Sequence, residues 1–402
     1  MPKQETLDGQ SKPLTLKEKL AMINSTVADI NKKFKTDVVY KASEGSKKGK
    51  LHKRVIPTPS LELNDALYCG GFKGIVELFG PNSSGKTSLA IDTIAKNQKE
   101  DPDFIAAWLE TEGSVTEEIL IDHDVDLERL IYWKQEDVNN AENALDVMRS
   151  FIEKGVVDMI VLNSVAGLAP STEIEEDLSK QNIALTARLL SKFFRVANAP
   201  LAKNNITMVF INQTRDKVGV MFGDPSTTTG GNAIGFYASQ RIRMNMLKLQ
   251  AGDPITMEQG VKIGFTVKKN RFSGRNNPFT KGEYYAIFGT GIDSVIPMPQ
   301  MLLDKGVVRQ SGAYWYYEDA NGNPIVIDGV EGKFKSKKDF LDCIRNNEAW
   351  RNELTSKISM SHQQSTEEIQ QAQRENEQNE AAMFDLSEDI SEEQYEDEED
   401  GS

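Results

Sequence analysis

The sequence contains few residues of the types that build disulfide frameworks or zinc sites. Among 402 residues there are two cysteines, Cys69 and Cys343, and three scattered histidines. This argues against a disulfide-rich scaffold and favours a reducing, intracellular setting. No run of 18 or more apolar residues occurs, and the first residues lack the apolar core of a signal peptide. We therefore expect neither a membrane span nor export.

An excess of basic charge is also missing, since the formal net charge is −14. The excess acid is confined to residues 361–402, which hold fifteen acidic side chains and one basic residue, Arg374. Residues 1–360 are balanced, so the acidic composition does not exclude a nucleic-acid partner. A hydrophobic content of 39% and a charged content of 27% fit a globular body with polar additions.

Residues 80–87 read Gly-Pro-Asn-Ser-Ser-Gly-Lys-Thr, the G-x-x-x-x-G-K-T pattern of a phosphate-binding loop. An apolar segment, 75–79, precedes it, and a segment with helical periodicity, 87–95, follows, which argues against a plain glycine-rich turn. Lys86 is predicted to reach the β- and γ-phosphates of ATP, and the Thr87 hydroxyl to bind Mg²⁺. The predicted nucleotide-binding residues are Gly80, Pro81, Asn82, Ser83, Ser84, Gly85, Lys86, Thr87 and Ser88.

Short apolar segments alternate with helical ones around this loop. The expected strands are 75–79, 104–109, 159–162 and 206–211, followed by the alternating segments 242–246 and 261–267. The first four predict a largely parallel sheet with helices on both faces, which is the α/β class. The last two alternate with period two and predict antiparallel strands that extend the sheet.

The remaining segments suggest four regions: 1–56, 57–289, 290–358 and 359–402. Residues 15–34 have helical spacing, and the basic segment 43–54 is either a solvated charge run or a nucleic-acid patch. Residues 290–358 predict a small α+β unit that ends in a helix over about 340–358. The acidic remainder is rich in Gln, Glu and Ser, so we expect it to be disordered.

Polar residues end three of the expected strands, where open α/β sheets bind ligands. Glu110 or Glu112 is placed to orient or deprotonate an attacking water, although an acidic helix start is the alternative. Asn163 stands where P-loop ATPases usually carry an acid for the Mg²⁺ shell, and its amide supplies an acceptor without charge. Gln213 is placed to sense a γ-phosphate.

A glycine- and threonine-rich segment, 214–232, follows Gln213 directly. Its amides, hydroxyls, Arg215 and Lys217 suit a phosphate backbone, but a mobile loop without a ligand is an equal alternative. Lys269 and Arg271 end a later strand. They either complete a neighbouring subunit's ATP site or form an ordinary basic strand end.

These motifs together closely resemble the RecA family of recombinases. The resemblance is carried by residues 80–87, 110–112, 157–170, 210–213 and 217–239, and it extends over about 15–358. It implies a RecA-like P-loop ATPase core with an N-terminal helix, a small C-terminal domain and an acidic tail. The implied activity is that of a DNA-dependent ATPase that forms helical filaments on single-stranded DNA and drives homologous pairing and strand exchange in repair.

The resemblance also implies roles for individual residues. Glu112 corresponds to the catalytic glutamate, Gln213 to the switch between γ-phosphate and DNA, and Lys269 and Arg271 to a pair that reaches across the subunit interface. The positions that correspond to DNA contacts are Ile183, Arg188, Ser191, Arg195, Arg215, Lys217, Val218, Gly219, Thr227, Thr228, Gly230, Gly231 and Asn232.

The implied partners are single-stranded DNA, double-stranded DNA, further copies of the chain and a single-strand-binding protein. ATP and Mg²⁺ are the implied cofactors, held at the subunit interface. The N-terminal helix resembles the family's polymerisation helix, residues 290–358 the duplex-gathering domain, and the tail an autoinhibitory segment. The expected location is the cytoplasm of a bacterium or of an infected host cell, without membrane association.

The chain departs from the family pattern at two places in the nucleotide site. Thr87 and Asn163 are the two predicted metal ligands, and Asn163 replaces the aspartate that is usual in the family. Ile119 stands where an aromatic residue commonly stacks on adenine. Two other functions share the same motifs: a hexameric DNA helicase with a RecA-like core, and a DNA-coating filament protein with weak ATPase, which the Asn163 substitution motivates.

Overall fold

The computed structural model describes residues 15–36, 38–42, 54–175, 185–216 and 226–358. The chain divides into two compact units, Met1–Lys53 and Arg54–Ser402. In the first unit, helix α1 spans Leu16–Phe34, as the periodicity predicted. It begins at a reciprocal cap, in which the Thr15 hydroxyl accepts from the Glu18 amide and the Glu18 carboxylate accepts from the Thr15 amide at 2.8 Å.

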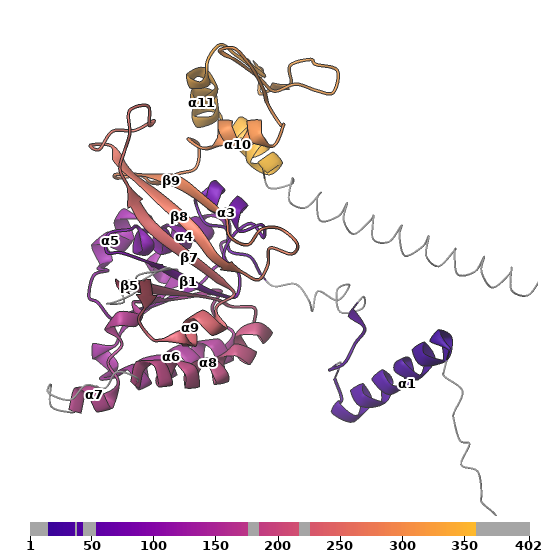
Figure 1. Ribbon diagram of the computed structural model, residues 1–402, viewed down its shortest axis with the longest axis vertical. Helices are drawn as coiled ribbons and strands as arrows, with labels where there is room; N and C mark the ends of the chain where they lie inside the picture. Colours follow the sequence, from indigo (N-terminus) through magenta and orange to yellow (C-terminus); the bar gives the residue numbers. More distant parts are fainter. Residues whose placement is uncertain (1–14, 37, 43–53, 176–184, 217–225, 359–402) are drawn as a thin grey trace, which may run out of the picture. The chain divides into compact units, whose positions relative to one another are not determined.

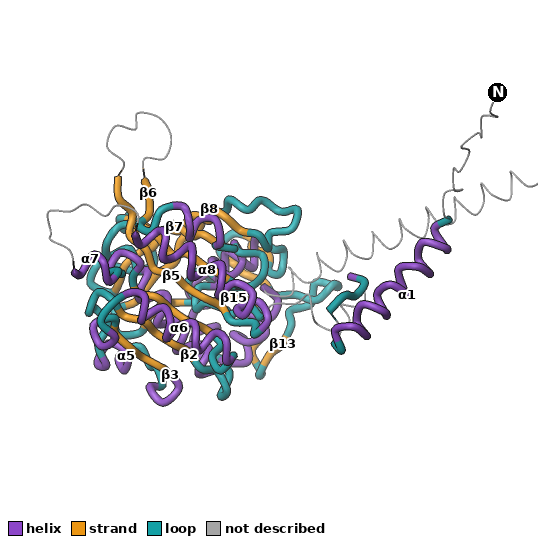
Figure 2. The backbone as a smooth tube through the Cα atoms, turned by 90° about the horizontal axis from the view of Figure 1, so that it is seen from below, coloured by secondary structure: helices purple, strands orange, loops and turns teal. Residues whose placement is uncertain are grey.

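The second unit is built on one large sheet (Figure 1). Its strands are β1 (Ile75–Gly80), β2 (Ala106–Glu110), β3 (Leu130–Lys134), β4 (Met159–Asn163), β5 (Thr207–Asp216), β6 (Ser226–Thr228), β7 (Gln240–Leu247), β8 (Gly260–Asn270), β9 (Lys281–Ile287) and β10 (Gly291–Asp293). The order is β10-β9-β8-β7-β1-β5-β4-β2-β3, and β6 pairs with the end of β5, at one margin of the body in Figure 2. This confirms a mostly parallel sheet.

Helices cover both faces of this sheet and create two separate cores (Figure 1). The helices are α3 (Leu61–Ala66), α4 (Lys86–Glu100), α5 (Glu117–Asp122), α6 (Ala141–Lys154), α7 (Ser171–Glu175), α8 (Leu185–Lys203) and α9 (Asn232–Tyr237). Helices α3, α4 and α5 pack on one face, while α6, α8 and α9 pack on the other. Because side chains alternate along a strand, neighbouring residues at each strand end reach opposite faces.

One predicted strand pairing needs correction, and some strands, β3, β9 and β10 among them, were not predicted. Strand β7 is antiparallel to β8 but parallel to β1, so only β8, β9 and β10 form the antiparallel extension. Strand β3 was not predicted, because it lies at the edge of the sheet and most of its side chains are only half-buried. The apolar pattern that marks a central parallel strand is therefore weak there.

Residues after β10 form a small α+β region with its own aromatic core. It contains α10 (Met298–Asp304), β11 (Arg309–Ser311), β12 (Tyr314–Tyr316), β13 (Val326–Ile327), β14 (Val330–Glu331), β15 (Lys333–Phe334) and α11 (Lys337–Asn346). The predicted helix over 340–358 is interrupted at Asn347, whose side chain accepts from the Trp350 amide and starts a new helix over 348–358. The predicted disordered tail lies outside the described residues.

Within the described ranges, no helix is long and apolar enough to cross a membrane. Of the predicted basic patch, 43–53 falls outside these ranges. Arg54 is described, and its guanidinium forms ion pairs with Asp101, at 2.7 Å, and with Asp158. Arg54 is therefore engaged with the body of its own chain.

Candidate active site

The phosphate-binding loop joins the end of β1 to the start of α4, as predicted. A Cβ on Gly80 would lie 2.1 Å from the carbonyl oxygen of Met244, so only glycine fits beside β7. Lys86 is buried, and its Nζ donates to the carbonyl oxygens of Gly80 at 3.2 Å and Pro81 at 2.6 Å. Burial lowers the pKa of Lys86. The turn thus carries a cation at a helix N-terminus, which suits an anionic phosphate.

Thr87 and Asn163 face each other across the sheet edge. The Thr87 hydroxyl is 3.4 Å from Oδ1 of Asn163, which ends β4 and is completely buried. Two neutral oxygen ligands and a buried cation fit a site for a triphosphate with its Mg²⁺, since Mg²⁺ prefers oxygen and keeps several of its waters. The Asn163 side chain supplies the acceptor but not the charge that an aspartate would add.

The two candidate glutamates after β2 have different surroundings. Glu110 is buried, and its carboxylate accepts from the Trp108 indole at 2.9 Å, from Asn163 Nδ2 at 2.9 Å and from the amides of Glu112 and Ser114. Its acceptor capacity is therefore occupied. Glu112 is exposed, so its carboxylate is the one accessible to a water molecule.

Glu112 also contacts the end of the strand that leads to the second loop. Gln213 Nε2 donates to Glu112 Oε1 at 2.8 Å, and the Ser164 hydroxyl donates to the same oxygen. The structure thus brings Glu112 and Gln213 together from strands β2 and β5. Because the two side chains share a hydrogen bond, a ligand that binds to one of them changes the hydrogen bonding of the other.

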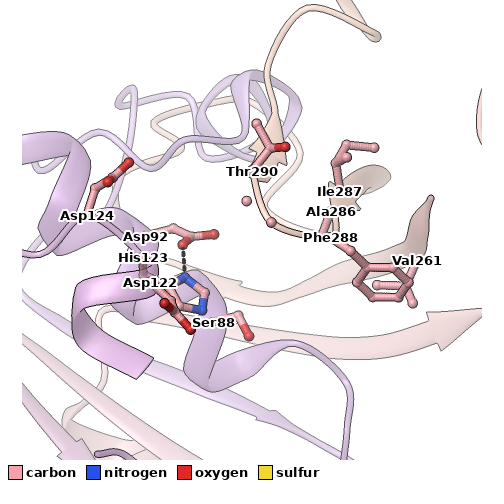
Figure 3. A pocket seen from close by; sticks show the side chains of 12 residues that line it. Ser88, Asp92, Asp122, His123, Asp124, Val261, Ala286, Ile287, Phe288 and Thr290 are labelled. Carbon is pink, nitrogen blue, oxygen red and sulfur yellow. Dashed lines mark hydrogen bonds and ion pairs between the residues drawn. The ribbon is translucent and has the colours of Figure 1, made fainter. Parts of the chain in front are cut away.

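A pocket of about 640 Å³ opens beside the first turn of α4 (Figure 3). One wall carries Ser88, Asp92 and His123, which come from α4 and from the end of α5; the opposite wall includes Phe288 and Thr290, after β9. His123 Nδ1 is hydrogen-bonded to Asp92, and this bond raises the pKa of the imidazole. Ile119 is exposed on α5 but does not line this pocket. Of the predicted nucleotide-binding residues, only Ser88 lines this pocket.

The predicted DNA contacts on α8 share one side of that helix. Arg188 and Arg195 are exposed and Ser191 is half-buried, at a spacing of three and four residues. Gly230 has φ +86, and a Cβ there would lie 2.9 Å from Leu190 Cδ1, so the end of the second loop packs on α8. Gly231 lies beside the same helix, near Ala187.

The other predicted DNA contacts have less structural description. Thr228 is half-buried in β6. Arg215, Thr227 and Asn232 are described through their backbone, in β5, β6 and α9 respectively. Ile183, Lys217, Val218 and Gly219 lie outside the described residues.

Lys269 and Arg271 lie at the end of β8 and are held by α9. Lys269 Nζ donates to the carbonyl oxygens of Gly235 at 2.8 Å and Phe236 at 3.1 Å, and Arg271 donates to Phe236 at 3.0 Å. Burial and the neighbouring Arg271 and Arg241 lower the pKa of Lys269. The two cations are therefore placed by α9, the helix that follows the second loop.

Sequence reasoning did not find three polar residues near the site: the buried Glu77 and Asn212 and the half-buried Arg241. Glu77 lies in the middle of β1 and is completely buried, with Asn212 and Arg241 as its partners. A usable signal was present, because a charged residue inside an otherwise apolar strand is unusual. Nothing in the sequence around Asn212 or Arg241 indicates that they pair with Glu77.

Comparisons with known proteins show the family of the chain. The model of the RecA N-terminal domain matches residues 21–293. Protein RecA of Bacteroides thetaiotaomicron is 38% identical over 307 residues, which cover 75% of this chain and 88% of the relative. Protein RecA of Clostridioides difficile is 34% identical over 81% of this chain and 89% of the relative, and that of Thermus aquaticus is 36% identical over 73% and 84%.

Proposed function

The chain belongs to the RecA family of ATP-dependent recombinases, which are DNA-dependent ATPases, and on that premise we propose how its residues couple ATP to DNA. The observation that carries the proposal is the 2.8 Å hydrogen bond from Gln213 to Glu112. It joins a candidate water-activating carboxylate to the strand that continues into the second loop. This chain aligns with proteins named RecA over 88% and 89% of their length, which favours a recombinase over a hexameric helicase.

Lys86 and the amides of the Gly80–Ser88 turn hold the triphosphate of ATP, and Thr87 and Asn163 hold the water shell of its Mg²⁺. Mg²⁺, when bound, neutralises charge on the phosphates. Glu112 orients and deprotonates the attacking water, because its carboxylate is exposed while that of Glu110 is occupied. Glu110 acts by fixing the backbone that carries Glu112.

Gln213 reports the γ-phosphate to the second loop. Its amide contacts Glu112 in this structure, and an exchange of that bond for a phosphate oxygen moves the end of β5. The loop that follows, 214–232, then contacts single-stranded DNA together with Arg188, Ser191 and Arg195 of α8. The packing of Gly230 against Leu190 supports this assignment, because it fixes one end of the loop beside that helix.

Neighbouring subunits complete each other's sites. Lys269 and Arg271 reach the phosphates bound by the next subunit of a filament, as cations supplied in trans do in related phosphoryl-transfer enzymes. Residues 1–56 join subunits through α1, residues 290–358 gather double-stranded DNA, and residues 359–402 compete with DNA for basic surface. A single-strand-binding protein is the expected accessory partner.

Substitution of Gln213 by alanine tests the switch. We expect nucleotide binding to persist while single-stranded DNA no longer stimulates ATP turnover, and the measurement is turnover with and without poly(dT). Gln250→Ala, in the exposed turn after β7, is a matched control that should retain stimulation. Stimulation that survives in Gln213→Ala would contradict the switch.

A further inference from the structure

Glu77 is a buried charge whose position calls for an explanation beyond stability. It lies in β1 between β5 and β7 and is completely buried. Nδ2 of Asn212 donates to it at 3.0 Å, and Nε of Arg241 donates to its other oxygen. Burying an ion pair costs desolvation free energy that the pair itself often only offsets. Apolar side chains at positions 77 and 241 together would therefore serve a purely structural purpose at least as well.

The Asn212 amide connects Glu77 to the nucleotide switch and to the second loop. Besides Glu77, its Nδ2 donates to the carbonyl oxygen of Thr229 at 2.9 Å, and its Oδ1 accepts from the backbone amide of Gln213 at 3.0 Å. Both donors and the acceptor are thus engaged. The backbone of Gln213 and the end of the loop at Thr229 are fixed to one side chain, and Glu77 holds that side chain in place.

The Arg241 guanidinium connects Glu77 to α9 on its other side. It lies over the Phe79 ring, 4.9 Å from the centroid, and a Cβ on Gly235 would lie 3.5 Å from its Nη1. Gly235 is also the residue whose carbonyl oxygen accepts from Lys269. The Arg241 guanidinium therefore packs beside the α9 backbone that positions Lys269 and Arg271.

We propose that Glu77 is a positioning residue that couples the two ends of the ATP site through Asn212 on one side and Arg241 on the other. The Gln213 end belongs to the nucleotide of the same chain, whereas the α9 end carries the two cations offered to a neighbour. Through Glu77, the position of Gln213 and the position of α9 depend on each other. The inference rests on the proposed function and names the residues through which that function is transmitted.

The double variant Glu77→Gln with Arg241→Met is the main test, because it removes both charges and leaves no unpaired buried ion. We expect unchanged affinity for a fluorescent ATP analogue and unchanged turnover without DNA. The ratio of turnover with poly(dT) to turnover without it should fall about 5- to 150-fold, the usual range for allosteric coupling. The single variant Glu77→Gln should lower the same ratio.

Asp253→Asn is the matched control. Asp253 pairs with Lys262 at 3.0 Å, and both side chains are largely buried, but the pair lies on the β8–β9 side and outside this network. It should lower thermal stability without lowering the stimulation ratio. An unchanged ratio in the double variant, or an equal loss in Asp253→Asn, would overturn the proposal. A wild-type chain without DNA stimulation would instead refute the proposed function itself.

Discussion

Two buried asparagines lie in neighbouring strands of the sheet and serve different purposes. Asn163 ends β4, and Asn212 lies in the next strand, β5; each donates from Nδ2 to a buried glutamate, at 2.9 Å to Glu110 and 3.0 Å to Glu77. Both are completely buried. They project to opposite faces of the sheet, toward α4 and toward α9 respectively.

The difference lies in what surrounds each glutamate. Glu110 is satisfied by an indole, an amide side chain and backbone amides, whereas Glu77 faces the guanidinium of Arg241. The Asn163 acceptor faces Thr87, in the candidate metal site, while the Asn212 acceptor binds the Gln213 backbone. One pair therefore shapes the chemistry of the site, and the other transmits its state.

The largest expected effect on ATP turnover comes from Glu112, the exposed one of the two candidate glutamates. Glu112→Gln should lower DNA-stimulated ATP turnover by about 10²- to 10⁴-fold, the usual contribution of a general base, with little change in thermal stability because Glu112 is exposed. Steady-state turnover and thermal unfolding measure both quantities. Glu117→Gln, an exposed position on α5, is the control. The assignment fails if Glu112→Gln retains full turnover.

The next effect tests why asparagine occurs at position 163. Asn163→Asp replaces the donor to Glu110 by a second carboxylate, so we expect the free energy of unfolding to fall by about 1–3 kcal/mol and turnover not to rise. The loss should be smaller near pH 5 than near pH 7.5, because protonation of one carboxyl relieves the repulsion. Urea unfolding at the two pH values checks this. A gain in ATP turnover would show instead that asparagine at position 163 lowers the activity of this chain.

Tyr284 offers a contrast to the two asparagines, since its hydroxyl is buried without a hydrogen-bond partner in the described part of the chain. A Cβ on Gly85 would lie 3.7 Å from this hydroxyl, and burial raises the pKa of Tyr284. Tyr284→Phe should leave the free energy of unfolding unchanged or raise it by about 1 kcal/mol. Chemical denaturation measures it, and a clear loss of stability would mean that the hydroxyl has a partner.

The smallest effect concerns Asp92 and His123 in the pocket beside α4. The bond to Asp92 raises the pKa of His123 above its ordinary value of about 6.5, so the pair stabilises the fold below that value and this contribution is lost as the pH rises through the higher pKa. Asp92→Asn should therefore cost more stability near pH 6 than near pH 8.5, by about 1 kcal/mol or less. Equal losses at both values would contradict it.

Much of the fold followed from local patterns in the sequence. The central strands β1, β2, β4 and β5 were predicted because buried parallel strands are short apolar runs, and the phosphate-binding loop because its residue types are fixed by an anion. The edge strand β3 and the break at Asn347 were missed. An edge strand is only partly apolar, and a break in a helix depends on a single capping side chain.

Outside the phosphate-binding loop, the candidate site was predictable where its residues lie at or just after strand ends. Glu112, Asn163 and Gln213 could be placed because the carboxyl ends of parallel strands meet at one edge. The family resemblance pointed to Glu112, but the strand-end pattern alone left Glu110 and Glu112 open, and the burial and hydrogen bonds that distinguish them appear only in the structure. The parallel pairing of β7 with β1, which puts Arg241 beside Glu77, was likewise decided at long range.

The sequence by itself determined the family, the phosphate-binding loop and the central strands β1, β2, β4 and β5, because each of these motifs and strands consists of residues close together in the chain. Tertiary structure alone decided which buried charges meet, since Glu77 lies 135 residues from Asn212 and 164 from Arg241. The physical reason is that a buried carboxylate takes its partners from whichever strands the sheet places beside it, and sheet order is a property of the whole fold.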